Sequence, residues 1–156
     1  MPHMKSELDH AVMAKAFFGS QHPLFNTFGI DVVAVADAKA EMTMPFSETL
    51  ADGRGALHRG TLVTLLDTTC GLAIFSALRS LRPIATIDLR VDYLRVIPSG
   101  SGLRAVVECI DWTDSVAFIS GRGYALDDET PLATVTGSFA IDTLGPAFDS
   151  KEMSTS

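Results

Sequence analysis

The apolar positions of this sequence repeat with two different periods. Residues 5–19 repeat them at the spacing of an amphipathic helix, and the stretch that follows, with Pro23 and Gly29, is expected to end that helix. Residues 30–46 predict two short strands around a turn near Asp37, and apolar and polar side chains alternate from Ala38 to Met44. A loop, "SETLADGRGA", leads to the next segment.

That next segment is long and almost uniformly apolar. The nineteen residues from Gly60 to Leu78 carry one charge, that of Asp67. Such a span is long enough to cross a bilayer, but Asp67 would then lie near the membrane midplane at a cost of about 2.5–3.5 kcal/mol. A helix that is apolar on all sides is more often enclosed by its own protein. Residues 59–79 therefore predict a buried central helix, and no membrane partner is expected.

Four strand-like runs follow the helix: "IATIDLRVDYLRVI", "LRAVVECIDW", "VAFISGRGYAL" and "LATVTGSFAI". Strict alternation in the first run predicts one apolar face and one polar face. The expected apolar face holds Ala85, Ile87, Leu89, Val91 and Tyr93, and the expected polar face holds Thr86, Asp88, Arg90 and Asp92. A sheet with one buried face needs a cover, and residues 59–79 can supply it. We therefore expect an α+β fold, with an antiparallel sheet curled around one long helix.

Length and composition indicate one domain. The chain has 156 residues, of which 47% are hydrophobic and 20% charged, and this balance is typical of a globular protein. It contains no internal repeat and no long linker. We expect an N-terminal helical segment over residues 1–21, one domain over 22–143 and a flexible C-terminal tail over 144–156.

Net charge and cysteine usage limit the kinds of binding partner and the cellular compartment that we expect. The net charge of -7 argues against nucleic acid and against an anionic membrane, because both select basic surfaces. Cys70 and Cys109 have neither disulfide-framework nor metal-ligand spacing, so no metal site is expected. The N-terminal residues are charged where a signal peptide would be apolar. A cytoplasmic protein is the simplest interpretation.

The start of the predicted helix carries a motif. The run "DGRGALHRGTLVTLLDTT" resembles that of the hotdog-fold acyl-CoA thioesterases of the phenylacetate-pathway (PaaI-like) type, whose helix opens with His-Gly-Gly and carries an acidic residue two turns later. Gly55, His58 and Gly60 fall at the family's positions, and Asp67 falls on its catalytic carboxylate. The downstream "ATIDLRVDYLR" is similar to the family's next strand, and the resemblance extends over about residues 22–142.

The resemblance implies a hotdog fold and hydrolysis of an acyl-CoA, with no cofactor beyond the coenzyme A of the substrate itself. Two positions depart from the family pattern. Arg59 stands where the family usually has its first motif glycine, and Asp52 stands where many members carry an amide.

The chemistry of the motif can also be argued from its residue types. Thioester hydrolysis expels a thiolate whose conjugate acid has a pKa of about 8.5, so the reaction chiefly needs an oxyanion site and a base or nucleophile. The unpaired N–H groups of Arg59 and Gly60 at the helix N-terminus are the candidate oxyanion site. Arginine keeps this N–H, provided that the backbone angles suit a side chain. Asp67 is the candidate general base or nucleophile, and the sequence leaves both roles open.

Helix geometry adds a prediction about assembly. Seven residues separate Gly60 from Asp67, or about 10 Å along a helix, so one helix cannot bring both groups to one carbonyl. Two antiparallel helices across a dyad can, which predicts a homodimer, or a dimer of dimers, with sites at the interface. The family resemblance implies the same. A stripe of small and polar residues is expected to face the partner or the substrate channel: Gly60, Thr64, Asp67, Thr68 and Gly71.

The remaining candidates have both functional and structural interpretations. His58 is expected to orient groups rather than act as the base. Thr64 and Thr68 are candidate substrate contacts or hydrogen-bond partners of Asp67. Thr86 matches a hydroxyl that assists catalysis in some relatives, or is simply a strand former. Asp52 either caps the "DGRG" turn or approaches Asp67 across the interface, where two carboxylates would raise one pKa.

Two alternative functions stay open. The departures at Arg59 and Asp52 are also compatible with a hotdog protein that binds acyl-CoA or an acyl carrier protein without hydrolysing it. A hotdog hydratase or dehydratase is weaker, because such enzymes are expected to pair Asp and His in another motif. The sequence contains neither a Gly-x-Ser-x-Gly elbow nor a Walker-type loop, which argues against a triad hydrolase and a nucleotide-binding enzyme. The acyl group, whether small, medium-chain or aromatic, is not specified.

Overall fold

The computed structural model describes residues 23–143. The predicted N-terminal helix and C-terminal tail lie outside this range, so both stay predictions. The elements, in chain order, are α2 (Pro23–Phe28), β1 (Asp31–Ala36), β2 (Lys39–Met44), the short 3-10 helix η1 (Glu48–Leu50), α3 (Arg59–Leu78), β3 (Ile84–Tyr93), β4 (Leu103–Trp112), β5 (Val116–Ala125) and β6 (Pro131–Ile141).

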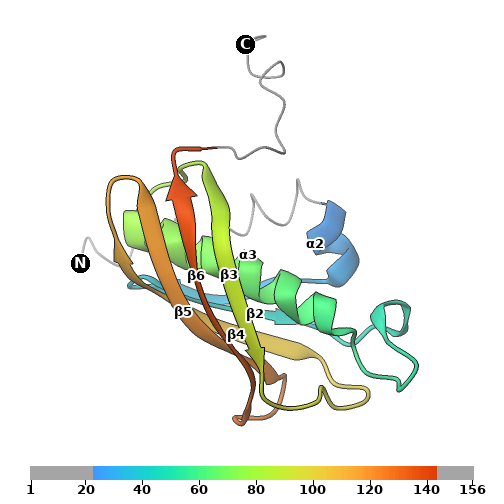
Figure 1. The fold of residues 1–156 in the computed structure, drawn as a ribbon. Helices are drawn as coiled ribbons and strands as arrows, with labels where there is room; N and C mark the ends of the chain where they lie inside the picture. The colour runs from blue at the N-terminus through green and yellow to red at the C-terminus, as the bar shows by residue number, and fades with distance from the viewer. Residues whose placement is uncertain (1–22, 144–156) are drawn as a thin grey trace, which may run out of the picture.

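The six strands form one antiparallel sheet that curls around α3 (Figure 1). The strand order is β1-β2-β4-β5-β6-β3, so β1 and β3 are the two edges. Side chains from β2, β4, β5 and β6 meet the apolar sides of α3 in a single core. The predicted α+β architecture, a sheet wrapped around a long central helix, is confirmed.

Helix α3 begins after His58 and ends at Arg79, whose φ of 55° lies in the left-handed region and stops the helix. It is long and apolar enough to cross a membrane by length and composition alone, but more than half of its most apolar stretch is buried inside the protein. All six residues from Thr69 to Ile74 are buried. This burial is typical of the core helix of a globular domain.

The segment after residue 22 differs from the prediction. We expected Pro23 and Gly29 only to break a helix, yet residues Pro23–Phe28 form α2, with Phe25 buried. Proline suits the first position of a helix, because its fixed φ is helical and the N–H it lacks would have no intrahelical partner there. Gly29, with a φ of 68°, then ends α2.

The turn between β1 and β2 lies where the sequence places it. Asp37 and Ala38 have φ values of 53° and 64°, as the two central residues of a tight hairpin require. The Ala38 N–H donates to the Ser76 hydroxyl of α3 at 3.1 Å, and its carbonyl accepts from the Cys109 N–H at 2.8 Å. The hairpin is thereby attached both to the helix and to β4.

Strand β3 contains a bulge that the sequence analysis missed. Its register with β6 shifts between Thr86 and Asp88, so Ile87 has no opposite residue. The bulge reverses which positions face the helix: Thr86 faces it before the bulge and Leu89 after it. The predicted alternation is therefore wrong before Asp88, and Ile87, placed on the apolar face, is 59% exposed.

Candidate active site

The N-terminus of α3 is capped by the residue before it. The Nδ1 atom of His58 accepts a hydrogen bond from the Gly60 N–H at 3.0 Å, and the His58 carbonyl accepts one from the Thr61 hydroxyl at 2.6 Å. One predicted oxyanion donor, the Gly60 N–H, is thus engaged by a side chain that can rotate. The Arg59 N–H has no acceptor among the described residues. Arg59 is the first helical residue and has no positive φ, so its backbone suits a side chain.

Asp67 lies two turns further along α3, half-buried, with one oxygen fixed. The Thr86 hydroxyl of β3 donates a hydrogen bond to Oδ1 at 2.9 Å. Burial raises the pKa of this carboxyl above its usual range, and the Thr86 hydrogen bond lowers it by a smaller amount. The site therefore holds a carboxylate that is only partly solvated and is oriented by one neutral donor.

The bulge in β3 makes this contact possible. Strict alternation would place Thr86 on the outer face of the sheet, away from α3. No sequence pattern announced the bulge, and the match of Thr86 to a family hydroxyl position was the only signal that could have found the contact.

The other predicted neighbours of Asp67 bond elsewhere. The Thr64 hydroxyl donates to the Gly60 carbonyl at 3.0 Å, and the Thr68 hydroxyl donates to the Thr64 carbonyl at 2.7 Å. Neither threonine hydroxyl bonds to Asp67, and among the described residues Thr86 supplies the hydrogen bond to its carboxylate. Gly71, which we placed in the same stripe, is buried. A Cβ atom there would lie 3.5 Å from Ile84 Cδ1, so β3 covers this position.

Asp52 lies in the loop before α3 and holds its turn. Its Oδ1 accepts from the Arg54 N–H at 2.9 Å, and its Oδ2 accepts from Arg54 Nη2 at 2.8 Å. The hydrogen bonds from the Arg54 side chain hold the pKa of Asp52 below its ordinary value. The geometry agrees with the turn-capping interpretation of Asp52, and the direction of this pKa shift is opposite to that of a carboxylate pair.

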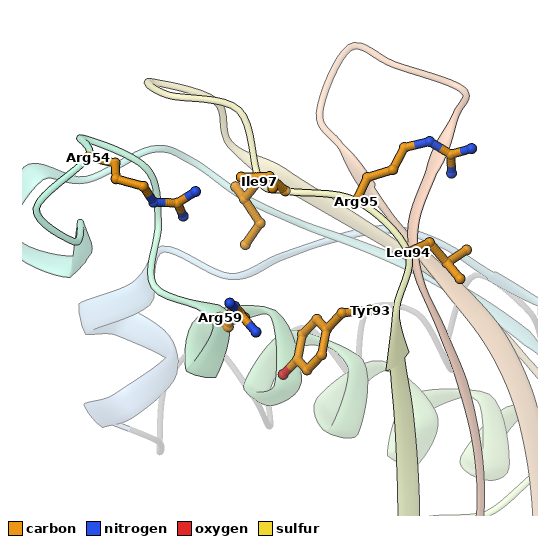
Figure 2. Close-up of a pocket in the computed structure, with 7 residues that line it drawn as sticks. Arg54, Arg59, Tyr93, Leu94, Arg95 and Ile97 are labelled. Atoms are coloured by element: carbon orange, nitrogen blue, oxygen red, sulfur yellow. The ribbon is translucent and has the colours of Figure 1, made fainter.

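Next to the helix N-terminus lies a cavity of about 260 Å³ that the sequence analysis did not predict (Figure 2). It is lined by Arg54, Arg59 and residues 93–97, which comprise the last residue of β3 and the segment after it. The Arg59 guanidinium lies over the Tyr93 ring, 5.3 Å from its centroid. The residue that departs most clearly from the family motif is thus part of a cationic pocket wall.

The two cysteines have no place in this chemistry. Both are free and buried. Burial, and then the nearby Asp67 charge, raise the pKa of the Cys70 thiol well above its ordinary value, so it stays protonated and unreactive.

A curled sheet around one helix, with a half-buried carboxylate two turns after a capped N-terminus, defines a hotdog-fold protein of the thioesterase class. The family model described as "Thioesterase superfamily" matches residues 54–132. A protein of Halobacterium salinarum that carries a provisional esterase name is 32% identical over 143 residues, covering 86% of this chain and 95% of that protein. The chain therefore belongs to the thioesterase superfamily, and these matches indicate a hydrolase.

Solved structures support the same fold. A thioesterase family protein from Silicibacter pomeroyi is 23% identical with a TM-score of 0.75, covering 85% of this chain and 97% of that chain. The E. coli PaaI protein from the phenylacetic acid degradation operon is 16% identical with a TM-score of 0.74, covering 85% of this chain and 94% of that chain. At these identities the likeness concerns the fold alone.

Proposed function

We propose that this protein is an acyl-CoA thioesterase that hydrolyses a small, medium-chain or aromatic acyl-CoA to the free acid and coenzyme A. The observation that carries the proposal is Asp67, a carboxylate of raised pKa held by Thr86 on a motif helix whose N-terminus presents N–H groups. Membership of the thioesterase superfamily supports the reaction class. The acyl group and the thiol carrier are part of the proposal.

The proposed site needs two copies of the chain. Asp67 and Gly60 lie about 10 Å apart along α3, too far for one carbonyl to meet both. Strand β3 supports a dimer, because this ten-residue edge strand is paired only with β6 in the described part of the chain. A second copy bound along β3 would lie beside Asp67, because Thr86 of β3 contacts that residue. We propose two sites for each dimer, and a dimer of dimers is compatible with them.

In each site the N–H groups of Arg59 and Gly60 from one copy would stabilise the oxyanion that forms on the thioester carbonyl. For the Gly60 N–H this requires the His58 ring to turn away from its 3.0 Å contact. Asp67 of the other copy would remove a proton from the attacking water, or attack the carbonyl itself to form an anhydride that water then opens. In both routes the thiolate leaves and takes up a proton.

Release of free thiol from a panel of acyl-CoAs tests the function, with wild type compared to Asp67→Asn. Turnover by wild type and its loss in the variant would support the proposal. Tight acyl-CoA binding by wild type without thiol release would replace it with a binding protein. Equal turnover by both would remove Asp67 from the mechanism.

Mixed dimers test the shared site. Asp67→Asn removes the carboxylate, and Gly60→Pro removes the N–H at a point where the first helical turn tolerates proline. If each site takes its two groups from different copies, the two inactive variants refolded together should recover about a quarter of wild-type activity, because half the dimers hold one intact site of two. If each chain carries a whole site, the mixture stays inactive.

Single-turnover hydrolysis in ¹⁸O-labelled water separates the two roles of Asp67. A general base delivers the label to the product acid in the first turnover. A nucleophile places it in Asp67 when water opens the anhydride at the aspartyl carbonyl, and peptide mass spectrometry then detects it there.

A further inference from the structure

The cavity beside the helix N-terminus gathers positive charge on a chain whose net charge is -7. Three other arginines of the described residues pair with carboxylates: Arg82 with Asp142, Arg90 with Asp92, and Arg104 with Glu41 and Glu129. Within residues 23–143, no carboxylate pairs with Arg59, whose guanidinium rests only on the Tyr93 ring. The charge of Arg59 is therefore available to a ligand.

Arg54 is held toward the same space. Its Nε and Nη2 atoms donate to Oδ2 of Asp52 at 3.2 and 2.8 Å, which leaves the Nη1 donors unused by that carboxylate. In Figure 2, Arg54 and Arg59 lie on the same side of residues 93–97 as the Tyr93 ring. Asp52 thus acts as a positioning residue that limits the conformations of an otherwise half-exposed arginine.

Arg95 also lines the cavity but serves another purpose. Its side chain extends away from Arg54 and Arg59 (Figure 2), and its Nη1 donates to the Pro131 carbonyl at 2.7 Å. Two guanidinium groups, those of Arg54 and Arg59, therefore form the cationic part of the cavity.

We propose that Arg54 and Arg59 bind phosphate groups of the nucleotide portion of coenzyme A, while Asp52 fixes Arg54 for this purpose. This inference rests on the proposed function and extends it to recognition of the thiol carrier. Guanidinium groups suit phosphate because they donate paired hydrogen bonds in a fixed plane. Both departures from the family motif, Asp52 and Arg59, then belong to one substrate-binding feature.

The position of the cavity supports this ligand. It adjoins the N–H groups proposed to hold the thioester, so a substrate bound there can extend a charged end into the cavity. A carrier protein presents a single phosphodiester on its pantetheine arm, whereas coenzyme A adds a second phosphate and a ribose phosphate beyond it. Two separate arginines match the more highly charged ligand.

Direct binding tests the inference without requiring catalysis. Titration calorimetry with adenosine 3′,5′-bisphosphate should show binding to the wild type that Arg59→Ala and Arg54→Ala each weaken about 10-fold, or about 1.4 kcal/mol. Arg90→Ala, which removes an arginine paired with Asp92 on β3, is the matched control and should leave the affinity unchanged. Equal affinity in all four proteins would overturn the proposal, as would 4′-phosphopantetheine binding more tightly than the nucleotide.

Kinetics with two substrates separate this inference from the proposed function. Arg59→Ala and Arg54→Ala should raise KM about 10-fold for an acyl-CoA. The increase should be clearly smaller for the same acyl group on N-acetylcysteamine, which has no phosphate. Equal losses on both substrates would contradict phosphate binding even if the enzyme is a thioesterase. Nucleotide binding that depends on both arginines, without hydrolysis of either substrate, would support the inference and reject the proposed function.

The role of Asp52 has its own test. Asp52→Asn weakens the ion pair, so it should reduce nucleotide affinity less than Arg54→Ala does. In the double variant Asp52→Asn/Arg54→Ala the affinity should equal that of Arg54→Ala alone, because Asp52 acts through Arg54. Independent, additive losses would show that Asp52 does not act through Arg54.

Discussion

The two halves of α3 lie in different surroundings. From Arg59 to Thr68 buried residues alternate with half-exposed or exposed ones, whereas Thr69 to Ile74 are all buried. Asp67 lies at the border between the two environments. A carboxylate there loses enough water to raise its pKa and still remains partly exposed. One helix thus serves as a site at its beginning and as a core at its end.

The largest effect is expected from Asp67→Asn, which removes the charge at that border. Activity should fall by about 10²–10⁴-fold, the usual contribution of a positioned base. Because the pKa of Asp67 is raised in the folded state, ionisation of this carboxyl reduces the free energy of unfolding. The reduction is absent below the ordinary pKa of 3.8, where the carboxyl is protonated, and present at neutral pH. The variant should therefore be more stable than wild type at pH 7 and equally stable near pH 3.

Urea unfolding at the two pH values measures this difference. Glu108→Gln, which removes an exposed carboxylate on β4, serves as the control. A stability of Asp67→Asn below that of wild type at pH 7 would mean that ionised Asp67 supports the fold.

In the enclosed half of α3, by contrast, a substitution should lower stability and leave activity unchanged. Leu72→Ala removes a side chain with no exposed surface, and should cost about 2–5 kcal/mol of unfolding free energy. Activity per folded molecule should stay near wild type, because Leu72 lies more than a turn beyond Asp67. Val63→Ala, on the partly exposed half, should cost clearly less. Equal losses of stability from both variants would erase the distinction between the two halves.

A subtler change separates hydroxyl groups that serve the site from those that serve the helix. Thr86→Val removes the donor that lowers the pKa of Asp67, so the acid limb of kcat/KM should move to higher pH. Thr86→Ser keeps the hydroxyl and should restore the wild-type profile. Thr69→Val removes a hydroxyl bonded to the Leu65 carbonyl within α3, and its profile should not move. A shift in the Thr69 variant would indicate a general structural effect.

The smallest effect is expected at the capped N-terminus. His58→Ala removes the acceptor of the Gly60 N–H and should cost about 1 kcal/mol, whereas His58→Asn supplies another capping oxygen and should cost less. Thermal unfolding of both variants provides the measurement. Equal melting temperatures for His58→Ala and wild type would show that the ring contributes nothing as a cap.

Much of the fold could be predicted because the spacing of apolar side chains along the sequence matches the elements that form. The apolar composition of α3 specifies a buried helix, and the regular alternation of β2 specifies a strand with one buried face. Strand β3 could not be placed fully, because Ile87 is an ordinary strand residue and nothing in its identity marks a bulge.

The candidate site was partly predictable for a similar reason. Asp67 and His58 belong to a local motif, whose spacing is written along one helix. The cavity joins Arg54 and Arg59 to residues 93–97, more than thirty positions later in the chain. Such a meeting depends on tertiary packing, which local patterns do not encode.

The bulge at Ile87 also limits how this strand can change in length. Deleting Ile87 would restore regular pairing with β6 but rotate one part of the strand, so either Thr86 would turn away from Asp67 or Leu89 would leave the core. Substitution of Ile87 affects neither contact. We therefore expect natural variants to accept many side chains at this position while keeping the residue count between Thr86 and Leu89 constant.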